Sequence, residues 1–570
     1  MVSLRKQGYY KIYISKEKKM KKVLAFLLAA VMLVAMFTAC SKQTVDEPAP
    51  SEQPAQSDSD KNTNTPAAEN NTEETEKPHI TIAYIAEANY PVADPENWGP
   101  CKQLEEDLGI DVEWLDWGND TDNYIEKLDL AVASGDAPDI FVMNEEQINK
   151  YLAQDALLCI DDYMDNYPNL KKWIDNDVVR GATTYAADGK LYSAVRQYSE
   201  QIYYFGMLGR QDVLNDLGIH YDGTTEGFLD MLRQLKEETG VAPFTFRHGV
   251  ENLVGYFGPT FGLPSYCNGY DYQGPTQQFI VSAIDDRLFT ELQFLNTMYS
   301  EGLLDPEYAL NTTDMWVEKM SSDQGFVTYD YLVRCEGLTN AVREENPDSA
   351  YEIRAIDLPV SPDGYHPGGA AIPTLATHAQ WGINADTKYP EACMAALDYV
   401  YRDDIINWAN YGEEGVTYDV VDGNIVFNEN VPTADNDFTT PGDPIDVNEY
   451  RANRVQFFGQ ICDSEAYAKT YYGKYSYAGY ERYKEKEWND LAAPVIPTIC
   501  YEEGEREQLA DLQTALKDFY IAECQSFIEG TRPLTADEYA KFQQEILEEY
   551  GGNEIMRIQN TAYQKWQAAK

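Results

Sequence analysis

Strand-like and helix-like runs alternate through residues 79–143, and this alternation constrains the fold more than any other feature. The strand-like runs are HITIAYIA (79–86), DVEWLDW (111–117) and DIFVM (139–143), and the helical runs are CKQLEEDLGI (101–110) and residues 124–134. Gly109 and Gly135 mark the helix ends. Strands that alternate with helices at this spacing predict βαβ units and a parallel sheet.

The same alternation continues through most of the chain. Thr224 or Thr225 is expected to cap a helix that carries Phe228, Leu232 and Leu235 on one stripe. Further strands are predicted at 190–195, 324–331 and 381–385, and further helices at 390–401, 506–527 and 536–550. Residues 79–570 are long enough for two or more domains, and the last third is mostly helical.

The N-terminal region predicts export. Four lysines at 18, 19, 21 and 22 precede the apolar run 23–37, which is shorter than the roughly 20 residues of a membrane-spanning helix. We interpret residues 1–39 as a signal peptide with Met20 as the true start. The ending Phe37-Thr38-Ala39-Cys40 resembles a bacterial lipoprotein box, although Phe37 departs from the usual Leu. The alternative is an ordinary secretory peptide cleaved near Ala39.

A lipidated Cys40 would place the protein at the outer face of the cell membrane. Two acyl chains, at about 0.8 kcal/mol per buried CH₂, give a stable anchor. Residues 41–78 are rich in Ser, Thr, Asn, Pro, Glu and Asp and have almost no large apolar side chains. Such a segment cannot offset its ordering entropy, so we expect a disordered tether between anchor and body.

The composition disfavours nucleic acid and anionic lipid as partners and favours a sugar. The net charge is −52, from 96 acidic and 44 basic residues, which disfavours nucleic acid and anionic headgroups. The 43 tyrosines suit surfaces that stack on sugars. Eight further cysteines are scattered without a CxxC pair, and the five histidines show no ligand spacing. We therefore predict no cofactor and no metal.

Nine segments in a fixed order resemble the extracellular solute-binding proteins of family 1, which serve ATP-binding-cassette importers. The large lipoprotein subgroup for oligosaccharide uptake is the most similar. The segments are LDLAVASGDAPDIFV (128–142), KYLAQDALLCIDDYM (150–164), GKLYSAV (189–195), LGRQDVLNDLGI (208–219), EGLLDPEY (301–308), KYPEACMAALDYVYRDD (388–404), YGEEGVTY (411–418), FIEGTRPL (527–534) and IQNTAYQKW (558–566). Together they cover nearly all of residues 79–570.

The resemblance implies an α/β, two-lobe periplasmic-binding-protein-like fold of type II, in which each lobe is a mostly parallel sheet flanked by helices. It implies a monomer that binds an oligosaccharide between the lobes and presents it to permease subunits. The expected limits are residues 79–198 and 379–412 for lobe 1, and residues 199–378 and 413–570 for lobe 2 with the helical C-terminal region.

Two departures from the family pattern are visible. Carbohydrate binders of the family often place an aromatic side chain where this chain has Met143 and Asn144. Some relatives carry a calcium loop after the helix that begins here near Thr225. The equivalent stretch, KEETGVAP, is short and poor in ligands, so no calcium site is predicted there.

Ligand residues in such folds lie on loops at the carboxyl ends of strands. For each aromatic candidate, packing in the core is the alternative. The candidates chosen on this basis are Glu87, Asn89, Trp98, Asn144, Glu145, Tyr329, Tyr331, Trp381 and Tyr411.

Two arginines are more specific candidates for ligand binding, because arginine is scarce in this acidic chain. Arg196 follows GKLYSAV and Arg210 lies in LGRQD. A bidentate guanidinium suits the carboxylate of a uronate. The alternative is an ion pair that braces the hinge, which we favour slightly for Arg210.

Two rival functions remain open at this point. A secreted carbohydrate-active enzyme would need a carboxylate pair, but the side chains of adjacent Glu413 and Glu414 diverge, and the chain has no HExxH or GxSxG. A peptide-binding lipoprotein of the same fold would show fewer stacking aromatics in its cleft.

The anchor yields the first prediction. Replacing Cys40→Ala is expected to leave an unprocessed precursor or to release the protein into the medium, with the fold intact. Membrane fractionation and the mass of the mature protein measure this. A mature variant that stays membrane-bound would contradict lipidation of Cys40.

Overall fold

The computed structural model describes residues 77–86, 90–183, 189–200, 202–264, 266–365, 371–372, 375–439, 442–486, 501 and 504–569. The predicted signal peptide, Cys40 and nearly all of the tether lie outside these residues. Within the described part of the chain, no helix is long and apolar enough to cross a membrane.

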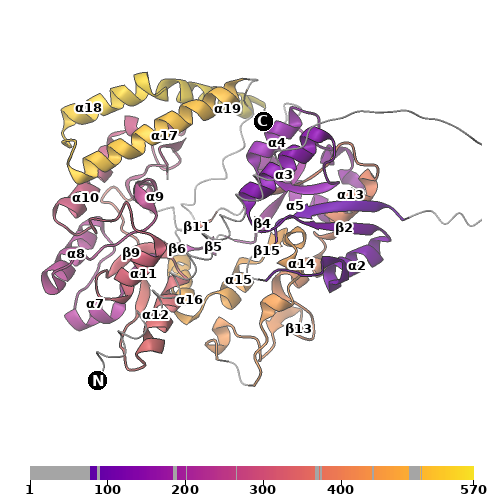
Figure 1. Cartoon of the computed structure of the whole chain (residues 1–570), viewed down its shortest axis with the longest axis horizontal. Helices are drawn as coiled ribbons and strands as arrows, with labels where there is room; N and C mark the ends of the chain where they lie inside the picture. Colours follow the sequence, from indigo (N-terminus) through magenta and orange to yellow (C-terminus); the bar gives the residue numbers. More distant parts are fainter. Residues whose placement is uncertain are drawn as a thin grey trace, which may run out of the picture. The chain divides into compact units, whose positions relative to one another are not determined.

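Three parallel strands begin the first lobe (Figure 1). β1 (His79–Tyr84) pairs with β2 (Asp111–Asp116) and with β3 (Ile140–Met143). Helices α2 (Gly99–Leu108) and α3 (Thr121–Ser134) connect them, and Gly109 and Gly135 end these helices at positive φ. The predicted strand–helix alternation is therefore confirmed, because glycine adopts the left-handed C-cap without strain.

A returning strand completes the six-stranded sheet of this lobe. β12 (Leu375–Ile383) runs antiparallel between β3 and β4 (Ser193–Tyr198), and β15 (Ile461–Cys462) pairs parallel with β4. The strand order is β15-β4-β12-β3-β1-β2. All strands except β12 therefore point the same way.

The second lobe differs from the expected parallel sheet. β6 (Phe205–Arg210) pairs antiparallel with both β9 (Val327–Tyr331) and β10 (Ile353–Ile356). Among the described residues of this lobe, parallel pairing is reduced to single bridges, from Phe244 to Leu304 and to Val327 and from Thr224 to Val360. Pro243 directly precedes the Phe244 bridges and lacks an N–H, which limits how far a parallel strand can extend here.

Helices cover both lobes, and short ribbons complete the structure (Figure 1). Beside the first sheet lie α4 (Glu145–Leu152), α5 (Pro168–Ile174), α6 (Asp177–Thr183), α13 (Pro390–Tyr399) and α14 (Asp403–Tyr411), whereas α15 (Ser464–Tyr471) packs against α14 and α16 (Lys474–Glu485) and contributes Ala468 to the second-lobe core. The helices of the second lobe are α7 (Gln211–Leu217), α8 (Thr225–Thr239), α9 (Gly249–Phe257), α10 (Asp286–Ser300), α11 (Thr313–Ser321), α12 (Arg334–Glu345) and α16. The ribbons pair β5 (Ile202–Tyr203) with β11 (Ala371–Ile372), β7 (Asn268–Tyr270) with β8 (Phe279–Val281), and β13 (Tyr418–Val421) with β14 (Asn424–Phe427).

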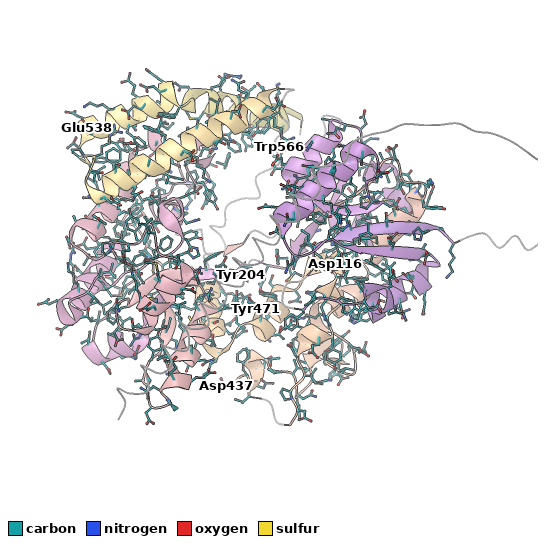
Figure 2. All side chains as sticks on the ribbon, viewed as in Figure 1. Asp116, Tyr204, Asp437, Tyr471, Glu538 and Trp566 are labelled. Atoms are coloured by element: carbon teal, nitrogen blue, oxygen red, sulfur yellow. The ribbon has the colours of Figure 1, made fainter. Side chains whose placement is uncertain are left out.

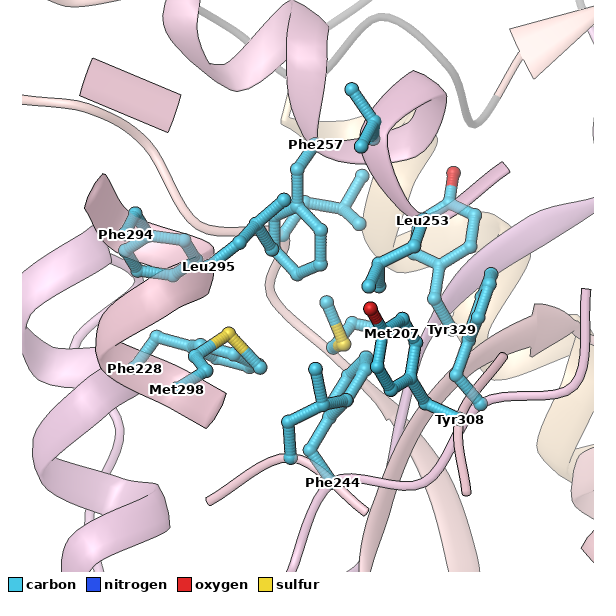
Figure 3. Packing of buried hydrophobic residues seen from close by; sticks show 14 of the residues in the cluster. Met207, Phe228, Phe244, Leu253, Phe257, Phe294, Leu295, Met298, Tyr308 and Tyr329 are labelled. Carbon is cyan, nitrogen blue, oxygen red and sulfur yellow. The ribbon is translucent and has the colours of Figure 1, made fainter. Parts of the chain in front are cut away.

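The predicted cap and stripe of α8 are confirmed. The Thr224 hydroxyl accepts the backbone N–H of Gly227 at 2.9 Å, which satisfies one free donor of the first turn. Phe228, Leu232 and Leu235 are fully buried. Figure 3 shows Phe228 among Phe294, Leu295 and Met298 of α10 in the second-lobe core.

Three C-terminal helices pack on the second lobe. α17 (Glu505–Glu529) lies against α9 and α10 and is followed by α18 (Ala536–Gln544) and α19 (Gly552–Ala569). A π-helical turn at Glu545–Glu549 follows α18, and the ring of Tyr550 beyond it stacks on Phe519 at 3.9 Å. The helices expected over 506–527 and 536–550 are thus present.

Each lobe has its own hydrophobic core. The first-lobe core is built on β1, β3, β4 and β12, and the second-lobe core on β6, β9, β10 and the helices around them. Residues 452–461, which the sequence placed in the return to the second lobe, contribute Val455, Phe457 and Ile461 to the first-lobe core. The seven described cysteines carry free thiols, and most of them are buried in these cores.

One buried carboxyl in the second lobe has no partner. Glu291 of α10 is 0% exposed, and neither carboxyl oxygen has a hydrogen-bond partner among the described residues. It borders a cavity of about 10 Å³ that Cys267 and Tyr520 also line. Burial raises the pKa of Glu291 well above its ordinary value. A neutral carboxylic acid is therefore the form that the fold accommodates.

The second prediction concerns pH and stability. Because the folded-state pKa of Glu291 is raised, the free energy of unfolding falls as pH rises above the unfolded-state pKa, at about 1.4 kcal/mol per pH unit, until the folded-state pKa is reached. Glu291→Gln is expected to remove this slope and to exceed the unmodified protein in stability at pH 8. Urea unfolding between pH 4 and 8 measures it.

The matched control is Glu237→Gln in α8. It makes the same change to a solvent-exposed carboxyl instead of a buried one. It is expected to keep the downward slope. An unchanged slope in Glu291→Gln would show that the Glu291 carboxyl reaches solvent when it ionises.

Candidate ligand-binding site

The carboxyl ends of the parallel strands in the first lobe meet at one edge of the sheet. Met143 at the end of β3 pairs with Gln380 of β12, and Gln380 pairs with Val195 of β4. Asn144 directly follows β3, and Arg196 is the residue after Val195 within β4. Both are therefore brought to the same edge of the sheet. The register of β12 shifts between Ala376 and Gln380, which opens the ladder beside Arg196.

Asn144 and Glu145 begin helix α4. The Asn144 side chain accepts the backbone N–H of Gln147 at 3.1 Å, so it caps the helix. Glu145 is exposed in the first turn, and the neighbouring Glu146 carbonyl accepts a hydrogen bond from Arg506 of α17 at 3.0 Å. Glu87 and Asn89, predicted after β1, lie outside the described residues.

Arg196 is a cation with few partners. Its Nε is buried and has no hydrogen-bond acceptor among the described residues. Its guanidinium lies over the ring of Tyr198 at 5.3 Å, two residues further along β4. Alternation along a strand puts both side chains on one face of the sheet. This pair places a charge and an aromatic surface next to each other at the strand edge.

Tyrosines from two distant segments gather beside this edge. Tyr204 follows β5, and its ring meets Tyr467 of α15 at a centroid distance of 5.7 Å. Tyr467 stacks on Tyr471 at 4.7 Å. Figure 2 labels Tyr204 and Tyr471 in this region. We call Tyr198, Tyr204, Tyr467 and Tyr471 the hinge tyrosines, because they lie where the chain passes between the two lobes.

A second aromatic group continues onto β6 and β9. Phe205 packs on Tyr331 at 4.1 Å, and His248 lies 6.3 Å from the same ring. Tyr331 is 38% exposed. Tyr256 covers the buried neighbour Tyr329 at 4.6 Å. Phe205 directly follows Tyr204, so the two groups are adjacent along the chain, although successive side chains of an extended segment point to opposite sides. We call the two groups together the aromatic strip.

Two predicted aromatics are enclosed by protein. Tyr329 is 3% exposed and lies beside Met207 in the second-lobe core (Figure 3), and Trp381 is 1% exposed. The Trp381 ring meets Phe457 edge-on at 4.9 Å. Both residues sit on strands that are covered on the face where their side chains point. We therefore propose a site that does not include them.

Arg210 is held by acids, as the ion-pair alternative expected. It is 5% exposed, and it donates to both carboxyl oxygens of Asp212 at 2.9 and 2.8 Å and to Asp323 at 2.6 Å. A buried guanidinium that already has two carboxylate partners has little capacity left for a ligand.

Tyr411 and Trp98 occupy other surroundings. The Tyr411 hydroxyl donates to Asp463 at 2.6 Å, and the side chain lines a hollow of about 650 Å³ with Glu200 and Lys469. Trp98 is half-buried before α2, and the guanidinium of Arg454 lies 5.6 Å from its ring. The structure thus brings Asn144 and Arg196 to one edge. Tyr411 lines a hollow together with the turn after β4 and α15, and Trp98 lies beside Arg454.

Several residues of the aromatic strip escaped the sequence analysis. Tyr198 could have been found, because it lies two residues after Arg196 on the same strand. QIYYFG (201–206) is a dense aromatic run that signals an unusual segment. Tyr467 begins the tyrosine-rich run YAKTYYGKYSYAGYERY (467–483), which is a similar signal, whereas Tyr256 carries no local signal.

The described residues contain no group of His, Cys, Asp or Glu that could hold a metal ion. Helix α8 ends at Gly240, and the following residues lead directly to Phe244. The arrangement at the strand edge is suited to noncovalent recognition: it offers flat apolar rings for stacking, amide and hydroxyl groups for hydrogen bonds, and the Arg196 guanidinium, whose Nε has no acceptor among the described residues.

The third prediction separates core from surface. Trp381→Ala is expected to lower the free energy of unfolding by about 3–5 kcal/mol, because it leaves a cavity in the first-lobe core. Tyr331→Ala is expected to cost about 1 kcal/mol or less, because its ring is partly in water. Urea denaturation of both variants measures the difference, and equal losses would contradict the assignment of Tyr331 to the surface.

Comparison with known proteins places this geometry in context. Residues 81–261 match the family described as bacterial extracellular solute-binding protein. The fructooligosaccharide ABC transporter substrate-binding protein FusA of Streptococcus pneumoniae is 22% identical over 520 residues, which is 84% of this chain and 88% of FusA. Lipoprotein LipO of Bacillus subtilis is 22% identical over 366 residues, covering 60% and 68% of the two chains.

Solved structures share the fold over most of the chain. The alginate-binding protein AlgQ2, in a crystal structure without calcium ion, aligns with a TM-score of 0.62 at 19% identity, over 86% of this chain and 99% of that one. A solute-binding protein from Bifidobacterium longum infantis, described as HMO binding, gives 0.62 at 15% identity, over 86% and 98%. These likenesses confirm the two-lobed α/β fold. Residues 81–261 are therefore similar in sequence to the bacterial extracellular solute-binding proteins, and the chain shares the fold of solved solute-binding proteins over most of its length.

Proposed function

We propose that this protein captures an oligosaccharide at the aromatic strip and delivers it to the permease of an ABC importer. The observation that carries the proposal is the strip itself. The hinge tyrosines gather near Arg196 of β4, and Phe205 and Tyr331 form a second pair of rings where β6 begins and β9 ends. Sugar rings present apolar faces that stack on such side chains, and their hydroxyls bond with the polar groups around them.

The relatives support the class of ligand. FusA is described as a fructooligosaccharide-binding protein, and AlgQ2 as an alginate-binding protein. They share neither a sugar nor a charge, so they support an oligosaccharide without selecting which one. The extended strip favours several sugar units over one, because a single ring would cover only part of it.

Segments between the lobes support reversible closure around the ligand. The turn after β4 is braced from the second lobe, since Glu200 accepts hydrogen bonds from Tyr480 at 3.1 Å and Lys484 at 2.8 Å. The Tyr472 hydroxyl donates to the Tyr203 carbonyl at 2.7 Å. Such contacts fix the connecting strands locally, so we expect motion to concentrate in the few residues around them.

The lipid anchor belongs to the same proposal. A protein tethered through Cys40 meets its permease at a high local concentration, which replaces diffusion through the medium. LipO, described as a lipoprotein, is consistent with this arrangement.

The test of function uses thermal shift with a panel of neutral and acidic oligosaccharides, monosaccharides and short peptides. Ligand at about 100 times its Kd is expected to stabilise the protein by about 2.7 kcal/mol. Any ligand that shifts the melting temperature is then incubated overnight with the protein and analysed. The expected result is a shift with an oligosaccharide that is recovered intact. Shifts with peptides alone would show that the ligand is a peptide and not a sugar. Cleavage of the sugar would contradict the assignment as a binding protein.

The site is tested with matched tyrosine variants. Tyr331 and Tyr389 are each 38% exposed, but Tyr389 lies before α13, away from the strip. Tyr331→Ala is expected to weaken oligosaccharide binding by about 1–2 kcal/mol, and Tyr389→Ala to leave it unchanged. Isothermal titration measures both. Equal affinities for the two variants would place the site elsewhere.

A further inference from the structure

Arg196 stands out among the arginines of this acidic chain. Arg210, Arg247 and Arg287, which are also mostly buried, each lie within 4.0 Å of a carboxylate. Among the described residues, Arg196 has no carboxylate partner: its Nε is buried without an acceptor, and its hydrogen-bonding neighbour is the Cys462 thiol, a weak acceptor. A guanidinium that is largely removed from water and unpaired is unfavourable unless something compensates it.

A second arginine adds to the positive potential. Arg451 is buried, and its donors reach the Asn410 carbonyl at 2.7 Å, Asn448 Oδ1 at 3.0 Å and Thr470 Oγ1 at 2.7 Å. All three acceptors are neutral. Both guanidinium groups act on Cys462 of β15, lowering its thiol pKa against the larger effect of burial, which raises it. Two arginines without a carboxylate in hydrogen-bond contact among the described residues therefore lie near Cys462 of β15.

The surroundings of Arg196 indicate what it can receive. Tyr198 lies under the guanidinium, and Tyr204 and Tyr467 are near enough to continue the aromatic surface. Stacking leaves the edge of a guanidinium free to donate. A ring stacked on the hinge tyrosines could therefore present a substituent to the donors of Arg196.

We propose that the ligand carries a carboxylate, as in a uronate-containing oligosaccharide, and that this carboxylate pairs with Arg196. The inference rests on the proposed oligosaccharide binding and adds the charge of the sugar. A planar guanidinium accepts a carboxylate through two parallel hydrogen bonds, which gives directional selection as well as attraction. Arg196 is then a specificity-determining residue, and Arg451 supports it through the local field without touching the ligand.

The alternative is that Arg196 has only a structural role, through its cation–π contact with Tyr198. This alternative predicts a different result. Loss of Arg196 would change stability but would not distinguish charged from neutral sugars. The experiment therefore compares ligands that differ only in charge. The probes are oligogalacturonides and alginate oligomers, the same oligomers with their carboxyls methyl-esterified, and neutral and sulfated oligosaccharides of equal length.

The variants are Arg196→Gln, Arg196→Lys and the control Arg402→Gln. Arg402 belongs to the same lobe and also lies over a tyrosine ring, at 4.6 Å from Tyr399, but it is paired with Asp107 and Asp404. Its replacement removes the same charge from the protein. Isothermal titration at two salt concentrations gives Kd for each protein and probe, and urea unfolding shows that each variant is folded.

The expected result is that one acidic series binds and that esterification weakens it ten- to a hundredfold. Arg196→Gln is expected to show the same loss for the acidic probe and none for its ester, Arg196→Lys an intermediate loss, and Arg402→Gln no loss. Preferential binding of neutral oligosaccharides, with Arg196→Gln unaffected, would overturn the inference and leave the proposed function standing. Preference for sulfated probes would contradict the inference that the ligand carries a carboxylate. Binding of no sugar at all would remove the proposed function and this inference with it.

Discussion

The returning strand β12 is the constraint on which the rest of the structure depends. It enters between β3 and β4 against their direction, and the buried Ser193 hydroxyl donates to the Gln380 side chain at 2.7 Å, which helps to fix its register. Because β12 fills this gap, the chain must leave the first lobe after β4 and come back much later. The second lobe is therefore an excursion of the same chain, and the passages between lobes fall beside the carboxyl ends of the strands. The site and the hinge occupy one region for this topological reason.

Sequence patterns predicted the local structure well and the packing of individual rings poorly. The helices, their glycine ends and the stripe of α8 follow from short-range periodicity, which the structure preserves. Tyr329 and Tyr331 show the limit. Both belong to β9, yet one is buried and the other partly exposed. Alternation says that two such residues share a face, but the covering of that face by Tyr256 and Phe205 depends on segments far away in sequence.

The arginines illustrate a similar limit. Scarcity of arginine singled out both Arg196 and Arg210, but only three-dimensional placement separates them. Asp212, two residues after Arg210, and Asp323 from a distant turn enclose one guanidinium. Around the other, the described neighbours are tyrosines and a cysteine. Sequence could suggest that these cations matter, whereas the presence or absence of a carboxylate partner is a property of the fold.

The large negative charge of the chain makes the difference between Arg196 and Arg210 important for binding an anion. A surface with a net charge of −52 repels an anionic sugar at long range, so diffusion alone does not favour the encounter. Salt screens that repulsion within about 8–10 Å, while a partly desolvated pair at Arg196 is screened much less. Raising the ionic strength should therefore speed association of an acidic oligosaccharide before it weakens the bound pair. A receptor with this charge can select an anion only through a local contact, and the Arg196 guanidinium beside the hinge tyrosines, which has no carboxylate partner among the described residues, is placed to make one.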